Sequence, residues 1–338
     1  MPAELLVIVT RGGLQENRHY GHIAVVDYNG KMIFSRGEPD YITYFRSAAK
    51  PIQAMEVIIS GAYDRYNFSD KELSIMCASH YGEKTHRNTV KAILSKIGLN
   101  KDSLLCGKTT SLNSGYAIEM ALQGYGPDVL FNDCSGKHAG FLAICKHKKY
   151  NLDDYIQLSH PLQQKISKRI ASMCEYDPEN IIHGTDGCGV PVHGMPISRM
   201  ALGYAKLAKT DNLSAQESDS AKIITNAMAT HPEMLSGTGG FCTALNAATR
   251  GRLFGKIGAE AVYCVGNQSN GQGLAIKLED GNLWRLPPIV TKTLKDLNWL
   301  TNRELSTLSN FSKMPVKNKH NEVVGYTSAY RGNDSKQF

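Results

Sequence analysis

The distribution of strand and helix signals along the chain is the feature that most constrains its fold. Strand signals gather at the two ends. Near the start, an Asn29-Gly30 turn lies between two apolar runs, which is typical of a β-hairpin. Near the other end, residues 258–266 and 273–278 repeat this pattern of apolar runs and turns. Hairpins from both ends can therefore pair in one antiparallel sheet.

The middle of the chain carries helix signals instead. The helix candidates are residues 51–59, 70–76, 86–97, 116–123, 139–147, 161–173, 196–208, 214–229 and 290–309. Because strand signals do not recur between them, a parallel sheet with alternating strands and helices is not expected. We expect a single α/β domain of residues 1–338, with an antiparallel sheet from about 5–45 and 250–335. A mainly helical region at about 47–248 would lie beside it, with the active site in the cleft between the two.

Composition excludes several classes of function. The net charge is +7, but the basic residues are dispersed, and the densest run, residues 146–149, is too short to indicate nucleic-acid binding. The apolar stretch at residues 5–9 is far shorter than a membrane helix or a signal peptide, so we expect a cytoplasmic protein without membrane contact. Eight cysteines in 338 residues are too sparse for a disulfide scaffold, so clustered cysteines indicate metal binding or catalysis.

A serine–lysine pair precedes the first helix candidate. Ser47 and Lys50 are three positions apart, and residues i and i+3 share one face of a helix. A lysine amine whose pKa is lowered can remove the proton of a serine hydroxyl and make it a nucleophile. The structural alternative is a helix cap followed by a surface lysine. No other S-x-x-K sequence occurs in the chain.

A second serine and a second lysine occur in glycine-containing segments. Ser79 lies in Cys77-Ala78-Ser79-His80, after a helix candidate, and Lys256 lies between two glycines at the start of a strand. Glycines let the backbone approach a ligand closely. The structural alternatives are a capped helix end for Ser79 and a solvated edge charge for Lys256.

Two loops contain an unusual mixture of Asp, Cys, Gly and His. One spans residues 132–138 and the other residues 183–193. Two thiolates with nitrogen ligands suit Zn²⁺. Spacing alone suggests a site of two cysteines and two histidines, namely Cys134, His138, Cys188 and His193. The alternative is a pair of inert thiols in glycine-rich turns.

Together these segments resemble the rhizobial-type (class 3) L-asparaginase family. The matching motifs occur in order from about residue 5 to residue 330: Arg46-Ser-Ala-Ala-Lys50-Pro51, Cys77-Ala-Ser79-His80, Asn132-Asp-Cys134-Ser-Gly-Lys137-His138, Gly184-Thr-Asp186-Gly-Cys188-Gly-Val-Pro191 and Lys256-Ile-Gly-Ala-Glu260. Five motifs in one order are far more specific than any one of them. The resemblance implies a serine β-lactamase/glutaminase-like fold, hydrolysis of L-asparagine to L-aspartate and ammonia, and a homodimer.

The resemblance also implies roles for individual residues. Ser47 is paired with Lys50 and Ser79 with Lys256 in the catalytic centre. Zinc, one ion per chain, is held by Cys134, Lys137 and Cys188 together with water, and this set replaces the one suggested by spacing. His138 and Asp186 are then expected beside the metal or the substrate. Arg46 is expected at the substrate carboxylate, because a guanidinium group suits a carboxylate.

Two other functions remain open from the residues. The first is a glutaminase or another amidohydrolase on the same scaffold. The penicillin-binding class is disfavoured, because no S-D-N sequence occurs and Lys108-Thr109-Thr110 lacks the glycine of K-T-G. Asparagine and glutamine differ by one methylene, worth only ~1–3 kcal/mol, so sequence does not separate them. The second is a non-catalytic zinc-binding or ligand-sensing protein, which has no need of Ser47 and Lys50.

Overall fold

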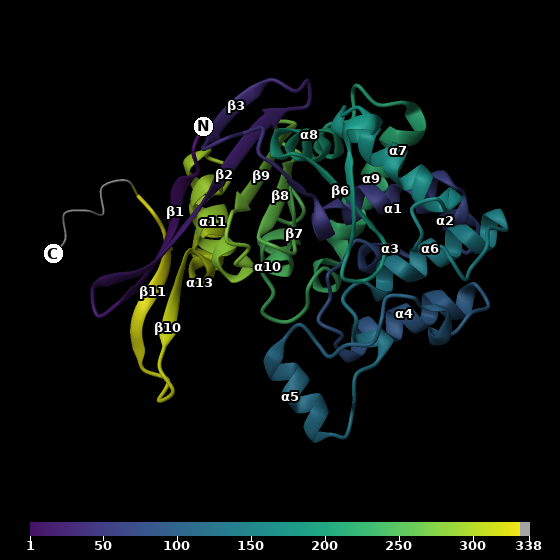
Figure 1. Ribbon diagram of the computed structural model, residues 1–338, viewed down its shortest axis with the longest axis horizontal. Helices are drawn as coiled ribbons and strands as arrows, with labels where there is room; N and C mark the ends of the chain where they lie inside the picture. Colours follow the sequence, from purple (N-terminus) through teal and green to yellow (C-terminus); the bar gives the residue numbers. More distant parts are fainter. Residues whose placement is uncertain (332–338) are drawn as a thin grey trace.

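An eight-stranded antiparallel sheet built from both ends of the chain dominates the computed structural model, which describes residues 1–331 (Figure 1). Its strands are β1 (Glu4–Arg11), β2 (Leu14–Asp27), β3 (Met32–Arg36), β7 (Leu253–Gly258), β8 (Val262–Asn267), β9 (Gln272–Leu278), β10 (Lys313–Lys317) and β11 (Val323–Ala329). The order is β10-β11-β1-β2-β9-β8-β7, and β3 pairs with β2. The predicted α/β fold with a sheet from both ends is therefore confirmed. Residues 332–335 of the predicted sheet lie outside the described residues.

The central strands are buried on both faces, which explains their nearly continuous apolar sequences. Val25 of β2 pairs with Leu274 of β9, and Leu274 pairs in turn with Val265 of β8. The helix α8 (Ile197–Ala208) packs against β2, β8 and β9. It approaches so closely that a Cβ atom on Gly273 of β9 would lie 1.9 Å from the carbonyl oxygen of Ala201. Only glycine fits this position.

The middle of the chain is mainly helical, as predicted. Its helices are α1 (Lys50–Ile59), α2 (Ala62–Arg65), α3 (Asp70–Met76), α4 (Lys84–Lys96), α5 (Ser114–Leu122), α6 (Ser135–Lys148), α7 (Pro161–Cys174), α8, α9 (Ala215–Thr230) and α10 (Phe241–Ala248). Most of them gather beside the sheet, and α5 extends away from the others (Figure 1). Three more follow β9: α11 (Leu286–Asp296), α12 (Asn302–Thr307) and α13 (Ser309–Ser312). Within residues 1–331, no helix combines the length and the apolar character needed to cross a membrane.

Two local predictions were wrong, and one helix was missed. A second sheet, β4-β6-β5, joins β4 (Ile42–Tyr44) to β5 (Ile182–Thr185) and β6 (Pro191–Pro196), so residues 42–44 do not belong to the main sheet. Helix α10 was not expected. The helix predicted at 290–309 is interrupted after α11, where Asn298 adopts a left-handed conformation with φ of 58°, which ends a helix.

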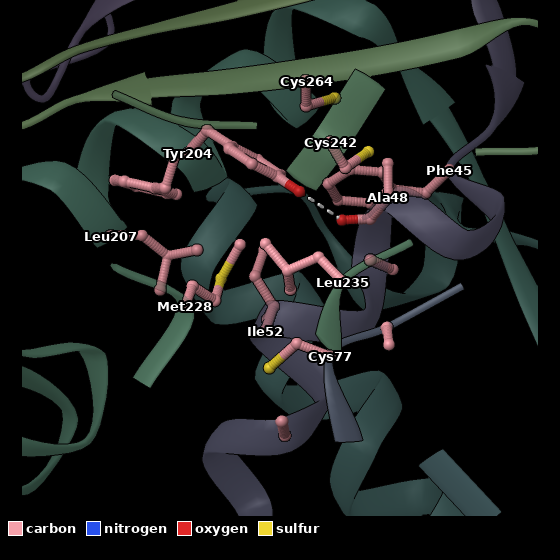
Figure 2. Close-up of a cluster of buried hydrophobic side chains, with 14 of the residues drawn as sticks. Phe45, Ala48, Ile52, Cys77, Tyr204, Leu207, Met228, Leu235, Cys242 and Cys264 are labelled. Atoms are coloured by element: carbon pink, nitrogen blue, oxygen red, sulfur yellow. Dashed lines mark hydrogen bonds between the residues drawn. The ribbon is translucent and has the colours of Figure 1, made fainter. Parts of the chain in front are cut away.

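A buried cluster holds the segment around residue 48 in place (Figure 2). Phe45, Ala48 and Ile52 pack in the core, and Tyr204 of α8 lies beside them. The Tyr204 hydroxyl donates a hydrogen bond of 2.7 Å to the carbonyl oxygen of Ala48. Because a buried hydroxyl needs a partner, this bond fixes the turn that carries Ser47.

Candidate active site

Ser47 lies in a tight turn immediately before α1, at one wall of a cavity. Residues Arg46–Ala49 form a short 3₁₀ helix, and Arg46 has a left-handed backbone with φ of 51°. Such a conformation is costly for a residue with a side chain and is often found at functional sites. Ser47 is buried, and it lines a cavity of about 290 Å³ together with Ser79 and Asp133.

The amine of Lys50 is buried and points toward Ser79. Its Nζ donates to the carbonyl oxygen of Ala78 at 2.6 Å and to Ser79 Oγ at 3.1 Å. It also lies 3.3 Å from Asp133 Oδ2. Burial alone would lower the pKa of Lys50, but the negative charges of Cys134 and Asp133 outweigh burial and raise it. Lys50 is therefore cationic in this arrangement. The serine to which its amine donates is Ser79.

Ser79 forms the centre of a lysine–serine–lysine chain. Lys256, on β7, donates from Nζ to Ser79 Oγ at 2.7 Å and to the carbonyl oxygen of Ile257 at 2.8 Å. Burial lowers the pKa of Lys256 to about 8, and the positive charge of Lys50 acts in the same direction. The structure thus brings together the predicted Ser79 and Lys256, and it places a readily deprotonated amine beside a hydroxyl.

The backbone on both sides of Ser79 is held by a loop from a distant part of the chain. The Ser79 N–H donates to the carbonyl oxygen of Leu235 at 3.0 Å, and the Tyr81 N–H donates to that of Ser236 at 2.7 Å. This strand-like pairing fixes the position of Ser79 after the end of α3. The side chain therefore does not depend on the helix alone for its orientation.

The two cysteine loops meet beside Lys50. Cys134 precedes α6, and Cys188 lies in the turn between β5 and β6. Their sulfur atoms and a carboxylate oxygen of Asp186 all lie within 4.8 Å of one another. Lys137 Nζ lies 3.1 Å from Cys188 Sγ. A hydrogen bond from Cys134, followed by the positive charge of Lys137, lowers the pKa of Cys188 despite burial, so the two hydrogen-bonded sulfurs share a negative charge.

This cluster fits a zinc ion by the chemistry of its donors. Sulfur and nitrogen ligands lie about 2.0–2.3 Å from zinc, so donors sharing one ion are within about 4.6 Å of one another. The donor atoms of Cys134, Asp186 and Cys188 lie within 4.8 Å of one another, close to this limit, so a small approach of the side chains would bring all three to one ion. The side chain of His138 is buried beside this group and forms a hydrogen bond with Cys188. Lys137, a predicted ligand, lies next to this group. Asp186, which was predicted beside the metal or the substrate, supplies a third donor atom.

Two other predicted groups lie next to the cluster. Arg46 Nε donates to Asp186 Oδ1 at 3.0 Å, which fixes the guanidinium beside Ser47. His138 Nδ1 lies 2.7 Å from the hydroxyl oxygen of Tyr155, and burial lowers the pKa of His138, so its ring is neutral. These contacts place both side chains near the cysteines.

The metal set suggested by spacing alone does not form. His193 is buried on β6, and its Nε2 lies 2.8 Å from the hydroxyl oxygen of Ser167 on α7. It is absent from the described group of metal-donor side chains, which contains Cys134, Asp186 and Cys188. Burial lowers the pKa of His193 to about 3, so it is a neutral structural residue.

Asp133 and Tyr155 are site residues that sequence reasoning did not single out. Asp133 bridges the two parts of the site, because its carboxylate contacts Lys50 Nζ and also lies 3.6 Å from Cys134 Sγ. Its place next to Cys134 in the motif was a usable signal. Tyr155 lies in no motif, and only the folded chain brings it to His138.

Comparisons with known proteins identify the family. The sequence profile of the family described as L-asparaginase II matches residues 7–329. No curated protein matches the chain. Among solved structures, a candidate β-lactamase from Bacteroides dorei DSM 17855 is 13% identical, with a TM-score of 0.42; the match covers 81% of this chain and 93% of that one. A β-lactamase from Mycobacterium bovis is 12% identical, with a TM-score of 0.42 and coverage of 82% and 94%. Because the family profile spans nearly the whole chain, the chain belongs to the L-asparaginase II family and is an L-asparaginase.

Proposed function

We propose that this L-asparaginase uses Ser47 as its nucleophile, within a chain of two serines and two lysines. Ser47 and Ser79 both line the cavity, which gives a substrate access to them. The observation that carries the proposal is the position of Ser79 Oγ, 3.1 Å from Lys50 Nζ and 2.7 Å from Lys256 Nζ. A hydroxyl between two amines can pass a proton from one to the other.

At mildly alkaline pH Lys50 carries a proton and Lys256 is neutral, because burial and the positive charge of Lys50 lower the pKa of Lys256 to about 8. The raised pKa of Lys50 opposes loss of this proton, so Lys50 becomes neutral only transiently, when the proton moves through Ser79 to Lys256. In that state the Lys50 amine can accept the proton of Ser47.

The reaction then proceeds in two steps. Ser47 Oγ attacks the side-chain amide carbon of asparagine, the C–N bond breaks, and ammonia leaves with a proton from the lysine pair. Water attacks the resulting ester, the bond to Ser47 breaks, and aspartate leaves as the serine regains its proton. The side chain of Arg46, held by Asp186, would bind the carboxylate of the substrate, with His138 nearby.

We further propose that Cys134, Lys137 and Cys188 hold one Zn²⁺. The ion would supply positive charge close to the substrate carboxylate and so aid binding. Burial lowers the pKa of Lys137, but the charges of Cys134 and Cys188 dominate and raise it. Lys137 must therefore lose its proton when it becomes a ligand.

Trapping of the covalent intermediate tests the nucleophile. The enzyme is mixed with asparagine, quenched in acid within one turnover and analysed by peptide mass mapping. We expect an aspartyl group on the peptide containing Ser47, and none in Ser47→Ala. An adduct on Ser79 instead, or near-normal ammonia release by Ser47→Ala, would overturn the assignment. Assays with glutamine in parallel measure the preference between the two amides.

We also propose that the enzyme is a cytoplasmic homodimer. All eight cysteines are free thiols, which suits a reducing compartment. The helix α5 exposes apolar side chains, with Ile118 at 64% and Leu122 at 85% exposure, which would suit a contact with a second copy. Light scattering of wild type and of Leu122→Asp tests the dimer, and cell fractionation tests the location.

A further inference from the structure

The cavity next to the catalytic serines is lined by two chemically different groups of side chains. One group is Ser47, Ser79 and Asp133, where the reacting amide would bind. The other group, which we call the aromatic end, contains Phe241, Trp284 and Phe311. The volume of about 290 Å³ is just below the usual range for small-molecule sites, about 300–1,000 Å³. An amide that releases only ammonia has no apolar group to offer the aromatic side chains.

The aromatic end is formed by α10 and by the segment of residues 283–314, which follows β9 and ends in β10. Its apolar lining consists of Phe241, Leu283, Trp284, Pro287, Phe311 and Met314. The rings of Phe241 and Phe311 have centroids 5.0 Å apart, an arrangement that gives a defined apolar wall. Trp284 remains 57% exposed. An apolar group in this space would be removed from water together with these side chains.

The charges of the site determine which part of a substrate enters this end. Asp133 is the only acidic or basic side chain among the cavity residues given by the described structure. The charged groups that suit the ends of an amino acid, Arg46 and Asp186, lie instead beside Ser47 and the cysteine cluster. With the amino-acid part bound there and the carbonyl carbon at Ser47, the amide nitrogen would be directed into the cavity that Ser47 shares with the apolar side chains.

We propose that the enzyme also hydrolyses β-amides of L-aspartate whose nitrogen carries a compact apolar or aromatic group, with Phe241, Trp284 and Phe311 forming the subsite for that group. This inference rests on the serine mechanism proposed above. Ser47 Oγ forms an ester with the aspartyl carbonyl, and the C–N bond breaks. The amine leaves with a proton from the lysine pair. Water then cleaves the ester to give aspartate and free serine.

A series of substrates tests this proposal with the full-length enzyme. The compounds are asparagine and the β-anilide, β-butylamide and β-(carboxymethyl)amide of L-aspartate, and the readout is aspartate formation. A single methylene in an apolar pocket changes kcat/KM by roughly 10–200-fold. We therefore expect the anilide and the butylamide to exceed the carboxymethylamide at least about tenfold in kcat/KM. Equal values, or a preference for the charged amide, would overturn the proposal.

Two variants and a matched control locate the subsite. Trp284→Ala and Phe311→Ala should each lower kcat/KM for the anilide about tenfold relative to asparagine. Tyr20→Ala removes another partly exposed aromatic ring, 42% accessible on β2 and not among the cavity residues, and should leave this ratio unchanged. If the ratio is the same in all three variants and the wild type, the aromatic end is not the subsite.

The substrate series also separates this inference from the mechanism on which it rests. Hydrolysis of asparagine through a Ser47 adduct, without hydrolysis of the apolar amides, overturns the subsite alone. An adduct on another residue, with the apolar preference intact, overturns the serine assignment and leaves the subsite standing. Both readouts use the same purified protein.

Discussion

Lys256 Nζ donates a 2.7 Å hydrogen bond to Ser79 Oγ, although the two residues are 177 positions apart in the chain. One comes from the edge strand of the sheet and the other from the end of a helix. The bond therefore joins the two structural halves of the enzyme at the site of chemistry. It is also the contact on which the proposed proton transfer depends.

Removal of the Ser79 hydroxyl should interrupt that transfer. In Ser79→Ala we expect kcat to fall by roughly 10²–10⁴-fold, the usual contribution of general acid–base catalysis, while KM changes little. Steady-state ammonia release measures both constants. Ser95→Ala, on the exposed side of α4, is the control and should behave as wild type. A loss confined to KM in Ser79→Ala would contradict a role in proton transfer.

The rate should rise with pH through the pKa of Lys256. Below a pKa of about 8 the amine is protonated and cannot accept a proton, and above it the amine is neutral. We therefore expect kcat to increase up to about pH 8 and then level off. In Lys256→Met the residual rate should lose this rising limb. A profile that falls between pH 7 and 9 in the wild type would contradict the assignment.

The same buried amine should reduce the stability of the fold. Its pKa is about 8 when folded and about 10.4 when unfolded, so the folded state disfavours the proton. The cost is complete below pH 8 and disappears as the pH rises toward 10.4, with an upper limit of about 3 kcal/mol. Replacement of Lys256 by an apolar residue would remove this cost, but it would also remove the hydrogen bonds to Ser79 and Ile257. The loss of these two bonds offsets about 2 kcal/mol of the gain.

Lys256→Met should therefore raise the free energy of unfolding by about 1 kcal/mol at pH 7 and lower it near pH 10. Denaturant titrations at the two pH values measure the difference. Lys91→Met, an exposed lysine on α4, supplies the control without a pH-dependent difference. If Lys256→Met raises the free energy of unfolding more at pH 10 than at pH 7, the pKa of Lys256 is raised in the folded enzyme, and the prediction is wrong.

Zinc binding should release protons and strengthen as the pH rises. Lys137 has a raised pKa beside the cysteine charges and must become neutral to coordinate the ion. Titration of the metal-free protein in buffers of different ionisation enthalpy counts the protons. Lys137→Met should weaken binding and release fewer protons. If Asp186→Asn weakens zinc binding and Lys137→Met does not, the third ligand is the carboxylate.

A methyl group at Gly258 should displace the turn that carries Ser47. A Cβ atom there would lie 3.0 Å from the carbonyl oxygen of Phe45 and 3.3 Å from the amide nitrogen of Ala48. Because a shift of about 1 Å costs around 100-fold in rate, we expect Gly258→Ala to lower kcat/KM roughly tenfold or more. Gly126→Ala, which meets no atom within 4 Å, should retain wild-type kinetics.

The sequence was sufficient for the main sheet and insufficient for the small one. The apolar runs on both sides of the Asn29-Gly30 turn correctly predicted β2 and β3. In contrast, β4 has only three residues, which is too few to show an alternating pattern. The strand β5 contains Gly184, and β6 begins with Pro191, and both residue types are unusual within strands. Helix α10 follows Gly239 and Gly240 and has no side-chain cap at its first turn, so the sequence contains no signal for its start.

The same limit applies to the site. The motifs supplied the residue types, and the i, i+3 relation is present, because Ser47 lies in the short 3₁₀ helix that leads into α1 and the Lys50 N–H donates to the Ser47 carbonyl oxygen. The side-chain amine of Lys50, however, donates to Ser79. A pairing between residues from separate loops depends on the packing of the whole molecule, which no local pattern contains.

The sheet built from both ends has a consequence for synthesis of the enzyme. The ribosome must translate the chain as far as β7 before Lys256 exists. The strand β2 must wait for β9, and β1 must wait for β11, before each has both of its sheet neighbours. Contacts of such long sequence separation form late in folding. A truncated or partly translated chain would therefore contain Ser47, Lys50 and Ser79 without Lys256. Amidase activity would then report that translation and folding have both been completed.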